Sequence, residues 1–122
     1  MFVLDTNELI YFSRGETAVT NFVLGSLERG EHFIISIVTL IEFLSHATIT
    51  DTDKVFFHNI LQRLRVSDLN YSLAMQAVEL RKIYRLKLGD SIIAALALMN
   101  KATLVSRDKD FKKIKNLEVL DI

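Results

Sequence analysis

The first seven residues, MFVLDTN, constrain the fold most, because a short apolar run ends abruptly in an acid and a helical pattern begins at once. Residues 2–4 are apolar, and two of them favour strands, which predicts a short buried strand. In an open parallel sheet, ligands bind beyond the carboxyl ends of the strands. Asp5 is therefore expected either to cap the helix that follows or to belong to a binding site.

Short apolar runs alternate with helical patterns along the rest of the chain. The runs predict further strands at residues 33–35, 65–67, 103–105 and 118–120. Helices are predicted at residues 6–14, 16–29, 37–44 and 51–64, from Asn70 or Ser72 to Lys87, and from Asp90 to Met99. Strands that alternate with helices predict a parallel sheet covered on both faces. We therefore expect one α/β domain over residues 1–122, with a three-layer α/β/α architecture and a central sheet of four to five strands.

Two helices carry apolar residues at the spacing of a core-facing stripe. The predicted core positions are Ile37, Leu40, Ile41 and Leu44 in the first of these helices, and Val55, Phe56, Ile60 and Leu61 in the second. The last helix is expected to start at Asp90 and Ser91, after an interruption at Gly89, and to be buried all round.

Composition restricts the class of protein. The chain has 122 residues, half of them hydrophobic, a formal net charge of zero and no cysteine. A neutral chain has no global field that attracts polyanions, so a nucleic acid would have to be held by local basic clusters. Without cysteine, disulfides and thiolate metal sites are excluded. No apolar run is long enough to span a bilayer and no signal-peptide pattern is present, so we expect a cytoplasmic protein without a membrane partner.

Acidic residues follow the predicted strands or open the last helix. They are Asp5, Glu42, Asp90, Asp108 and Asp110. Taken singly, Asp5 and Asp90 could be helix N-caps, and Asp108 and Asp110 could be solvated turn residues. Glu42 cannot cap a helix because it lies within one, and a partly buried carboxylate there requires a partner.

Taken together, these acids indicate a metal site. Carboxylates gathered at one sheet edge raise one another's pKa unless cations neutralise them. No His or Cys lies beside them in the sequence, and an all-oxygen set suits Mg²⁺ or Mn²⁺ rather than zinc. One or two such ions could activate a water molecule, so the predicted reaction is metal-assisted phosphodiester hydrolysis.

Four segments carry a family resemblance: FVLDTN at 2–7, SIVTLIEF at 36–43, KLGDSIIAA at 87–95 and LVSRDKDF at 104–111. In sequence, order and spacing they resemble the PIN-domain ribonucleases, in particular the VapC-type toxins of prokaryotic toxin–antitoxin pairs. The segments bracket nearly the whole chain. One motif alone would be weak, whereas four in register are specific.

The resemblance implies catalytic metal ligands at Asp5, Glu42 and Asp90, with Asp108 as the fourth acid. Family members often have Asn at the fourth place and Thr two residues earlier, where this chain has Asp108 and Ser106. Whether Asp108 or Asp110 contacts the metal is left open. Supporting positions are implied at Thr6, Asn7, Ser36, Thr39 and Ser106. Helix capping by Thr6 and Ser36, and surface polarity for Thr39, are the alternatives.

Two local basic clusters could hold RNA. One comprises Arg81, Lys82, Arg85 and Lys87, and the other Arg107, Lys109, Lys112, Lys113 and Lys115. The residues expected to contact phosphate are Arg14, Arg85, Lys87 and Arg107, because they lie near predicted strand ends or acids. Binding through several phosphates would depend strongly on salt.

The resemblance implies a Mg²⁺- or Mn²⁺-dependent endoribonuclease that leaves a 5′-phosphate and a 3′-hydroxyl, with tRNA or rRNA as substrate. It also implies a homodimer and a VapB-like antitoxin partner. A catalytically inactive PIN-like module that binds RNA or protein is the main alternative. A phosphoacceptor receiver domain fits less well, because it requires an adjacent acid pair where Asp5 is followed by Thr6 and Asn7. The sequence does not separate a toxin from a housekeeping nuclease.

Overall fold

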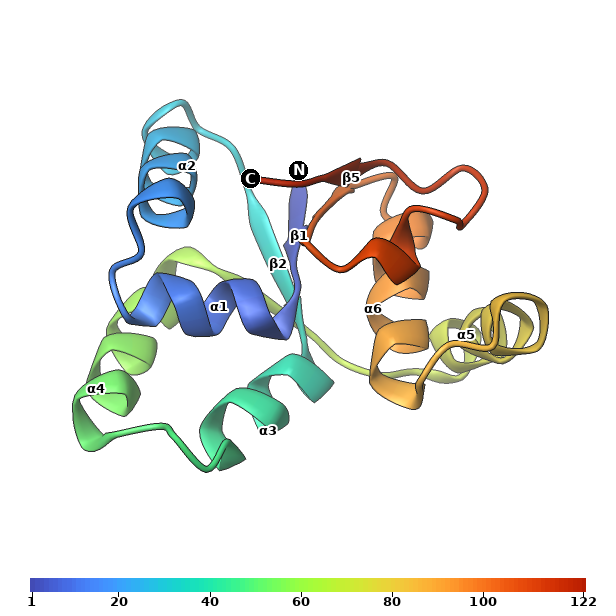
Figure 1. Cartoon of the computed structure of the whole chain (residues 1–122), viewed down its shortest axis with the longest axis horizontal. Coiled ribbons are helices and arrows are strands. Elements are labelled where there is room, and N and C mark those ends of the chain that lie inside the picture. The colour runs from blue at the N-terminus through green and yellow to red at the C-terminus, as the bar shows by residue number, and fades with distance from the viewer.

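A five-stranded sheet forms the centre of the protein. The computed structural model describes residues 1–122, and its sheet has the strand order β3-β2-β1-β4-β5, with all neighbouring pairs parallel (Figure 1). The strands are β1 (Phe2–Leu4), β2 (Phe33–Ser36), β3 (Arg65–Ser67), β4 (Thr103–Val105) and β5 (Val119–Leu120). The predicted strands and the α/β class are confirmed.

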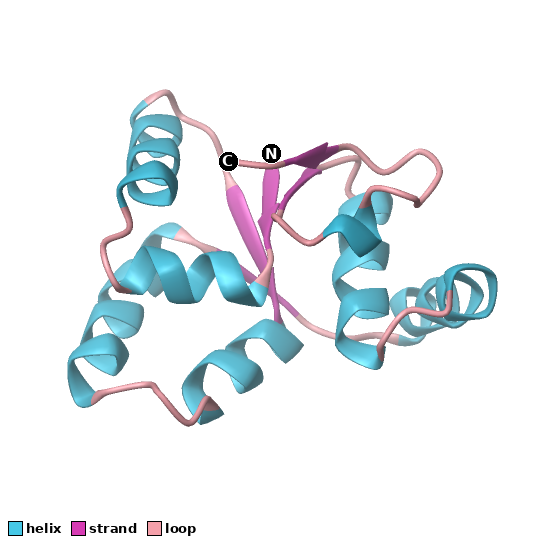
Figure 2. Cartoon of the chain, in the orientation of Figure 1, coloured by secondary structure: helices cyan, strands magenta, loops and turns pink.

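Helices cover both faces of the sheet, as Figure 2 shows: α1, α2 and α4 lie on one side, and α5 and α6 on the other. The helices are α1 (Thr6–Ser13), α2 (Thr17–Glu28), α3 (Ile37–Ser45), α4 (Asp51–Ile60), α5 (Tyr71–Tyr84) and α6 (Leu88–Met99). Two short 3₁₀ turns follow, η1 (Leu61–Arg63) after α4 and η2 (Lys109–Phe111) after β4. No helix combines the length and the apolar character needed to cross a membrane.

The strands feed two cores because successive side chains of a strand point to opposite faces. Val3 of β1 joins the core with α5 and α6, whereas its neighbour Leu4 joins the core with α1 and α4. In the second core the rings of Phe43 and Phe57 stack with centroids 4.9 Å apart. Phe56 packs edge-on against another core ring at 5.0 Å. The adjacent phenylalanines of α4 are thus both used in packing.

Two predicted core positions are wrong. The side chain of Ile41 is 57% exposed and that of Val55 is 61% exposed. In α3 the buried residues are Thr39 and Phe43, because this helix packs against α1 and α6 at the carboxyl end of the sheet and not across a sheet face. In α4 the inward face runs through Phe57 and Ile60. Apolar spacing gave the correct helices but not the correct buried stripe.

The start of α6 also differs from the prediction. The helix begins at Leu88, with Lys87 as the N-cap residue, so Gly89 is helical and Asp90 lies within the first turn. The Ser91 N–H donates to the Lys87 carbonyl at 2.9 Å, which fixes this earlier start. Asp90 is therefore not an N-cap, and its carboxylate is not used to satisfy the end of the helix.

Candidate active site

The strand order creates a crevice between β1 and β4. The chain runs from β1 to β2 and β3 on one side, and then to β4 and β5 on the other side of β1. Such a reversal is a topological switch point, where open parallel sheets bind their ligands beyond the carboxyl ends of the strands. Asp5 follows β1 and Ser106 follows β4, so both residues lie at this point.

Asp5 is held by both of its oxygens. The Thr6 N–H donates to Oδ1 at 2.7 Å, and the Ser106 hydroxyl donates to Oδ2 at 2.8 Å. The side chain is only 6% exposed. Burial raises the pKa of Asp5, the two hydrogen bonds oppose this, and the nearby charges of Asp108 and Glu42 raise it further. Asp5 therefore caps α1 and also belongs to a cluster of carboxylates.

Glu42 lies on α3, exposed, and faces Thr6. The Thr6 hydroxyl is 2.9 Å from Glu42 Oε1 and 3.3 Å from the Thr39 hydroxyl. Thr6 thus orients Glu42, and Thr39 is fully buried, so surface polarity is the wrong interpretation for Thr39. A Cβ on Gly89 would lie 3.4 Å from Glu42 Oε2, which shows how closely the first turn of α6 approaches this carboxylate.

Asp90 is half-buried in the first turn of α6, and its pKa is raised to about 6. Burial is the largest cause, followed by the charges of Asp5 and Asp108, while Lys87 lowers the pKa and Glu42 adds to the increase. A charge acts on a carboxylate this strongly only when it lies close by. The structure therefore brings the four predicted acids to one edge of the sheet.

Asp108 and Asp110 play different structural roles. The Asp108 N–H donates to the Ser106 hydroxyl at 3.0 Å, and Asp108 Oδ1 accepts the Asp110 N–H at 2.9 Å. Asp108 is half-buried and its charge acts on both Asp5 and Asp90, whereas Asp110 is exposed and does not contribute to either shift. Of the two, Asp108 is the member of the cluster.

The remaining supporting positions fall into two groups. Ser36 is buried and accepts the Val38 N–H at 3.0 Å, so it caps α3 as one alternative predicted. Asn7 is exposed and borders a hollow of about 240 Å³, whose other lining residues are Asp5, Glu8, Tyr11, Arg107 and Asp108.

The donor set fits a hard divalent cation in its chemistry. All four acids offer oxygen only, and their unbalanced charge raises the pKa of Asp5 and Asp90. As the side chains stand, no three His, Asp or Glu residues converge tightly enough to hold an ion. Binding would therefore require these carboxylates to turn toward a common point.

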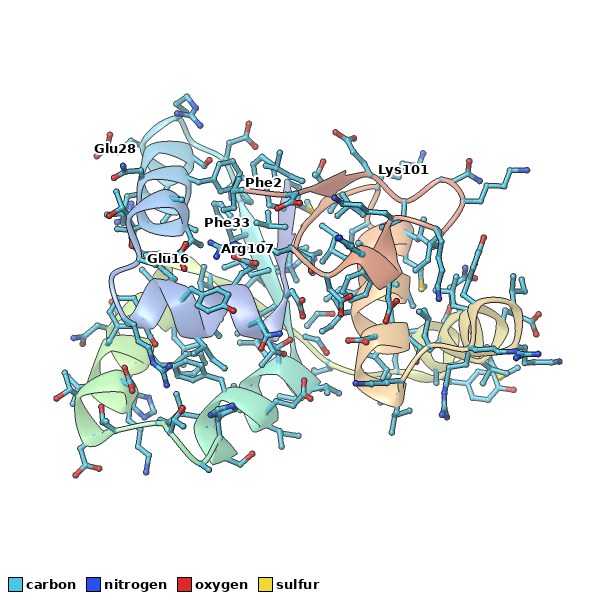
Figure 3. All side chains as sticks on the ribbon, in the orientation of Figure 1. Phe2, Glu16, Glu28, Phe33, Lys101 and Arg107 are labelled. Carbon is cyan, nitrogen blue, oxygen red and sulfur yellow. The ribbon has the colours of Figure 1, made fainter.

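The basic residues predicted to contact phosphate are not equivalent. Arg14 is hydrogen-bonded to Thr48, and Arg107 is paired with Glu16, as Figure 3 shows for the latter two side chains. Arg85 and Lys87 are exposed at the junction of α5 and α6. The side chains of these two make no hydrogen bond or ion pair, and Lys87 lies close enough to Asp90 to lower its pKa.

Glu8 is a residue of the site that the sequence reasoning missed. It is 1% exposed, its Oε1 accepts the Arg107 N–H at 3.2 Å, and its Oε2 has no hydrogen-bond partner. Burial raises the pKa of Glu8, and Arg107 opposes this. The available signal was its position four residues before the buried Phe12, on the inward face of α1.

Comparison with known proteins identifies the family. The PIN-domain sequence profile matches residues 2–117. The chain belongs to the PIN-domain family. The resemblance inferred from the four motifs is thereby confirmed. Among curated protein sequences, none matches this chain significantly.

Solved structures with this PIN fold come from several organisms. VapBC2 from Rickettsia felis, bound to a promoter DNA fragment, matches with 25% identity and a TM-score of 0.83, over 98% of this chain and 96% of that chain. A toxin–antitoxin complex from Klebsiella pneumoniae matches with 28% identity and a TM-score of 0.81, over 99% and 97%. DNA-bound VapBC from Salmonella typhimurium shares the fold, with a TM-score of 0.82 at 20% identity, over 98% and 96%.

Proposed function

We propose that this PIN domain is a metal-dependent endoribonuclease and the toxin of a VapBC-type toxin–antitoxin pair. The observation that carries the proposal is the cluster of Asp5, Glu42, Asp90 and Asp108 at the switch point of the sheet, where the charges of Glu42 and Asp108 act on both Asp5 and Asp90. The similarity to VapBC and toxin–antitoxin structures supports the toxin assignment.

Asp5, Glu42 and Asp90 would hold one or two Mg²⁺ or Mn²⁺ ions, with Asp108 as the fourth ligand. We assign the fourth position to Asp108 in preference to Asp110, because Asp108 is half-buried beside Ser106 whereas Asp110 is exposed. When bound, such an ion lowers the pKa of water and offsets charge on a reacting phosphate.

The protein's own contribution is to anchor two of the carboxylates, Asp5 and Glu42, which limits how far they must turn to reach a common ion. Ser106 and the Thr6 N–H hold the two oxygens of Asp5, and the Thr6 hydroxyl holds Glu42. Positioned groups lose little freedom when they act, so this arrangement reduces the entropic cost of the reaction. Lys87 lies close enough to Asp90 to lower its pKa and would approach an RNA phosphate from the same side.

RNA would be held by a basic surface that combines both sequence clusters. The Lys115 N–H donates to the Tyr84 hydroxyl at 2.9 Å, which ties the segment after η2 to the end of α5. This contact places the backbone of Lys115 beside the end of α5, where Arg85 follows Tyr84. A basic surface beside the acids favours a structured RNA such as tRNA or rRNA, because several phosphates can be neutralised together.

A VapB-like antitoxin and a second copy of this chain are the proposed protein partners. Support for the antitoxin comes from the matched structures, one of which is described as a toxin–antitoxin complex. Where a short reading frame for a DNA-binding protein adjoins the gene, co-expression with it should yield a stable complex with suppressed RNA cleavage. Light scattering of the purified protein should give twice the monomer mass if the chain forms homodimers.

The cleavage test compares Asp5→Asn and Asp90→Asn with Asp121→Asn, an exposed carboxylate that pairs only with Lys112 near the C-terminus. With Mn²⁺ and a labelled structured RNA, we expect both site variants to lose at least about 10²-fold in rate, because each removes a charged ligand. Asp121→Asn should retain wild-type activity. Circular dichroism would confirm that all three are folded, and cleavage by folded Asp5→Asn would contradict the proposal.

A further inference from the structure

We propose that Glu8 is a positioning residue, which anchors Arg107 and thereby holds the loop that carries Asp108 against Asp5. This inference rests on the proposed function for its catalytic consequence, although the anchoring itself does not. The term "Arg107 clamp" is used below for Glu8, Tyr11, Glu16 and Arg107.

Glu8 makes two contacts with one residue. Its Oε1 accepts the Arg107 backbone N–H at 3.2 Å and lies 3.4 Å from the guanidinium Nε of the same residue. A carboxylate with 1% exposure requires such a counter-charge, because an unpaired buried charge is costly. Glu8 Oε2 has no hydrogen-bond partner, so the contacts with Arg107 alone offset the cost of burying the Glu8 charge.

The far end of Arg107 is fixed as well. Nη1 donates to Glu16 Oε2 at 3.1 Å, and Nη2 donates to Glu16 Oε1, which makes a two-pronged pair. The guanidinium carbon lies 4.6 Å from the centre of the Tyr11 ring, in the geometry of a cation–π contact. Arg107 therefore joins the loop after β4 to α1 and to the start of α2.

The Arg107 clamp holds the loop after β4 at a point between two residues of the site, Ser106 and Asp108. Ser106, just before Arg107, donates its hydroxyl to Asp5, and Asp108, just after it, donates its N–H to the same Ser106 hydroxyl. Arg107 is the residue of this tripeptide that contacts α1. Loss of the Glu8 contact would free the Arg107 backbone N–H and leave only the far end of its side chain held by Glu16 and Tyr11, so Asp108 would be held less firmly near Asp5.

The clamp also explains why Arg107 is a poor RNA ligand. Its guanidinium nitrogens face two carboxylates and one of its faces is covered by Tyr11, so a phosphate would have to displace existing partners. Residues that orient a metal ligand from outside the coordination sphere typically alter metal affinity or activity by about 10- to 100-fold when mutated. We assign Arg107 and Glu8 to that role.

The test compares Glu8→Gln with Asp53→Asn, because Asp53 is also a buried carboxylate but belongs to the N-terminal capping box of α4. Glu16→Gln is the second variant, since Glu16 is only half-buried and its replacement allows folding even if that of Glu8 does not. The first measurement is amide hydrogen exchange of residues 105–111 without divalent ions. The second is the dependence of RNA cleavage on Mn²⁺ concentration, with kcat and KM for RNA determined separately.

We expect Glu8→Gln to accelerate exchange at Arg107 and Asp108 and to raise the Mn²⁺ concentration for half-maximal rate about tenfold or more, with KM for RNA unchanged. Glu16→Gln should act in the same direction with a smaller effect. Asp53→Asn should accelerate exchange in α4 only. Wild-type exchange at residues 105–111 in Glu8→Gln, or equal acceleration there in Asp53→Asn, would overturn the inference. A wild-type protein that cleaves no RNA would instead overturn the proposed nuclease, and the exchange result would still decide on the clamp.

Discussion

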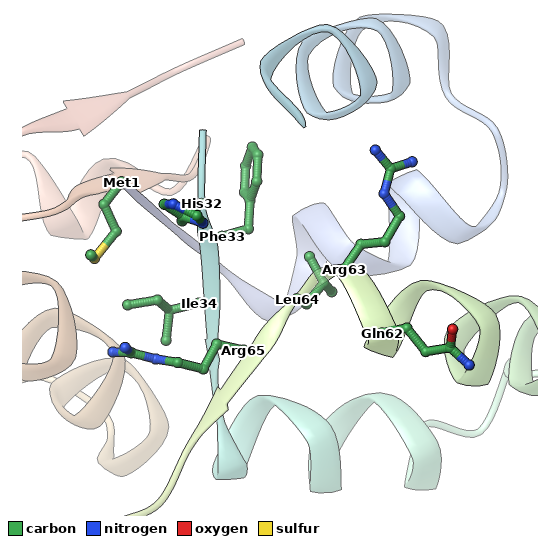
Figure 4. A pocket seen from close by; sticks show the side chains of 8 residues that line it. All are labelled: Met1, His32, Phe33, Ile34, Gln62, Arg63, Leu64 and Arg65. Carbon is green, nitrogen blue, oxygen red and sulfur yellow. The ribbon is translucent and has the colours of Figure 1, made fainter. Parts of the chain in front are cut away.

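The two ends of the same strands differ in charge and in chemistry. At the carboxyl ends of β1 and β4, carboxylates surround a hollow of about 240 Å³. At the amino ends of β1, β2 and β3 lies another hollow, of about 390 Å³, shown in Figure 4. Its charged and polar lining residues are His32, Gln62, Arg63 and Arg65. The larger of these two hollows has basic side chains and no acid, so size alone does not locate the site.

Part of the difference follows from how helices connect to a parallel sheet. Asp5 and Ser36 end β1 and β2 and cap the N-termini of α1 and α3, where the helix dipole favours negative charge. At the opposite end, α2 and α6 finish just before β2 and β4 but carry no basic residue in their last turn, and the arginines of the hollow, Arg63 and Arg65, come from η1 and β3. The comparison teaches that the helix dipole favours the acids at the carboxyl ends, whereas the bases at the amino ends have a separate origin.

The largest expected effect is on RNA affinity, which should fall when basic residues are replaced at the carboxyl end of the sheet but not at the amino end. In an Asp90→Asn background, which should bind without cutting, the pair Arg85→Gln/Lys87→Gln should weaken RNA binding about tenfold and reduce the salt slope by about 1.5. The pair Arg63→Gln/Arg65→Gln at the amino end should leave both values unchanged. Filter binding at several salt concentrations measures them. Equal losses in both pairs would show that RNA binds by unspecific attraction.

An intermediate effect concerns the crowding of acids at the carboxyl end. The pKa of Asp90 is raised to about 6 in the folded protein, so protonation of Asp90 stabilises the folded state. This contribution to the unfolding free energy is fully present below pH 4 and is lost as the pH rises through 6. Without divalent ions, Asp90→Asn should therefore match the wild type near pH 4 and exceed its unfolding free energy by roughly 1 to 2 kcal/mol above pH 7, after allowance for solvent screening.

Thermal melts of both proteins between pH 4 and 8, with a chelator present, measure this difference. Glu42→Gln is the matched comparison, because Glu42 is exposed and hydrogen-bonded to Thr6. Its melting curve should change less than that of Asp90→Asn. The same difference in unfolding free energy between Asp90→Asn and wild type at every pH would argue against a raised pKa of Asp90 in the folded protein.

The smallest expected effect is on the unfolding free energy when one glycine at each end of the sheet is replaced by alanine. Gly30, before β2, has φ +81°, and alanine there should lower the unfolding free energy by about 1 kcal/mol. Gly89, in the first turn of α6, has no positive φ, and a Cβ would make only ordinary contact with Glu42. Gly89→Ala should be neutral or stabilising by less than about 1 kcal/mol. Urea melts measure both, and a large loss for Gly89→Ala would indicate that α6 must approach Glu42 more closely.

Most of the framework was predictable because it depends on local patterns. Except for β3, each strand of the sheet is a short apolar run followed by a polar residue or a turn, and Asp5 was recognisable as the residue where β1 gives way to α1. Glu42 and Asp90 were recognisable as an acid within a helix and an acid at the start of the last helix, and the family resemblance then implied that they are metal ligands. The exposed Ile41 and Val55 were not predictable, because helical spacing gives an apolar stripe but not the angle at which the helix meets its neighbours.

The sequence by itself determined the alternation of strands and helices, the family, and the identity of the acids. Only the tertiary structure decided that Ser106 and Thr6 fix Asp5 and Glu42, and that Glu8 is buried against Arg107. The physical reason is that periodicity and capping act over a few residues, whereas these contacts join positions 36 to 101 residues apart in the chain. Which charged groups meet is set by the order of strands in the sheet, and that order appears only once the chain is folded.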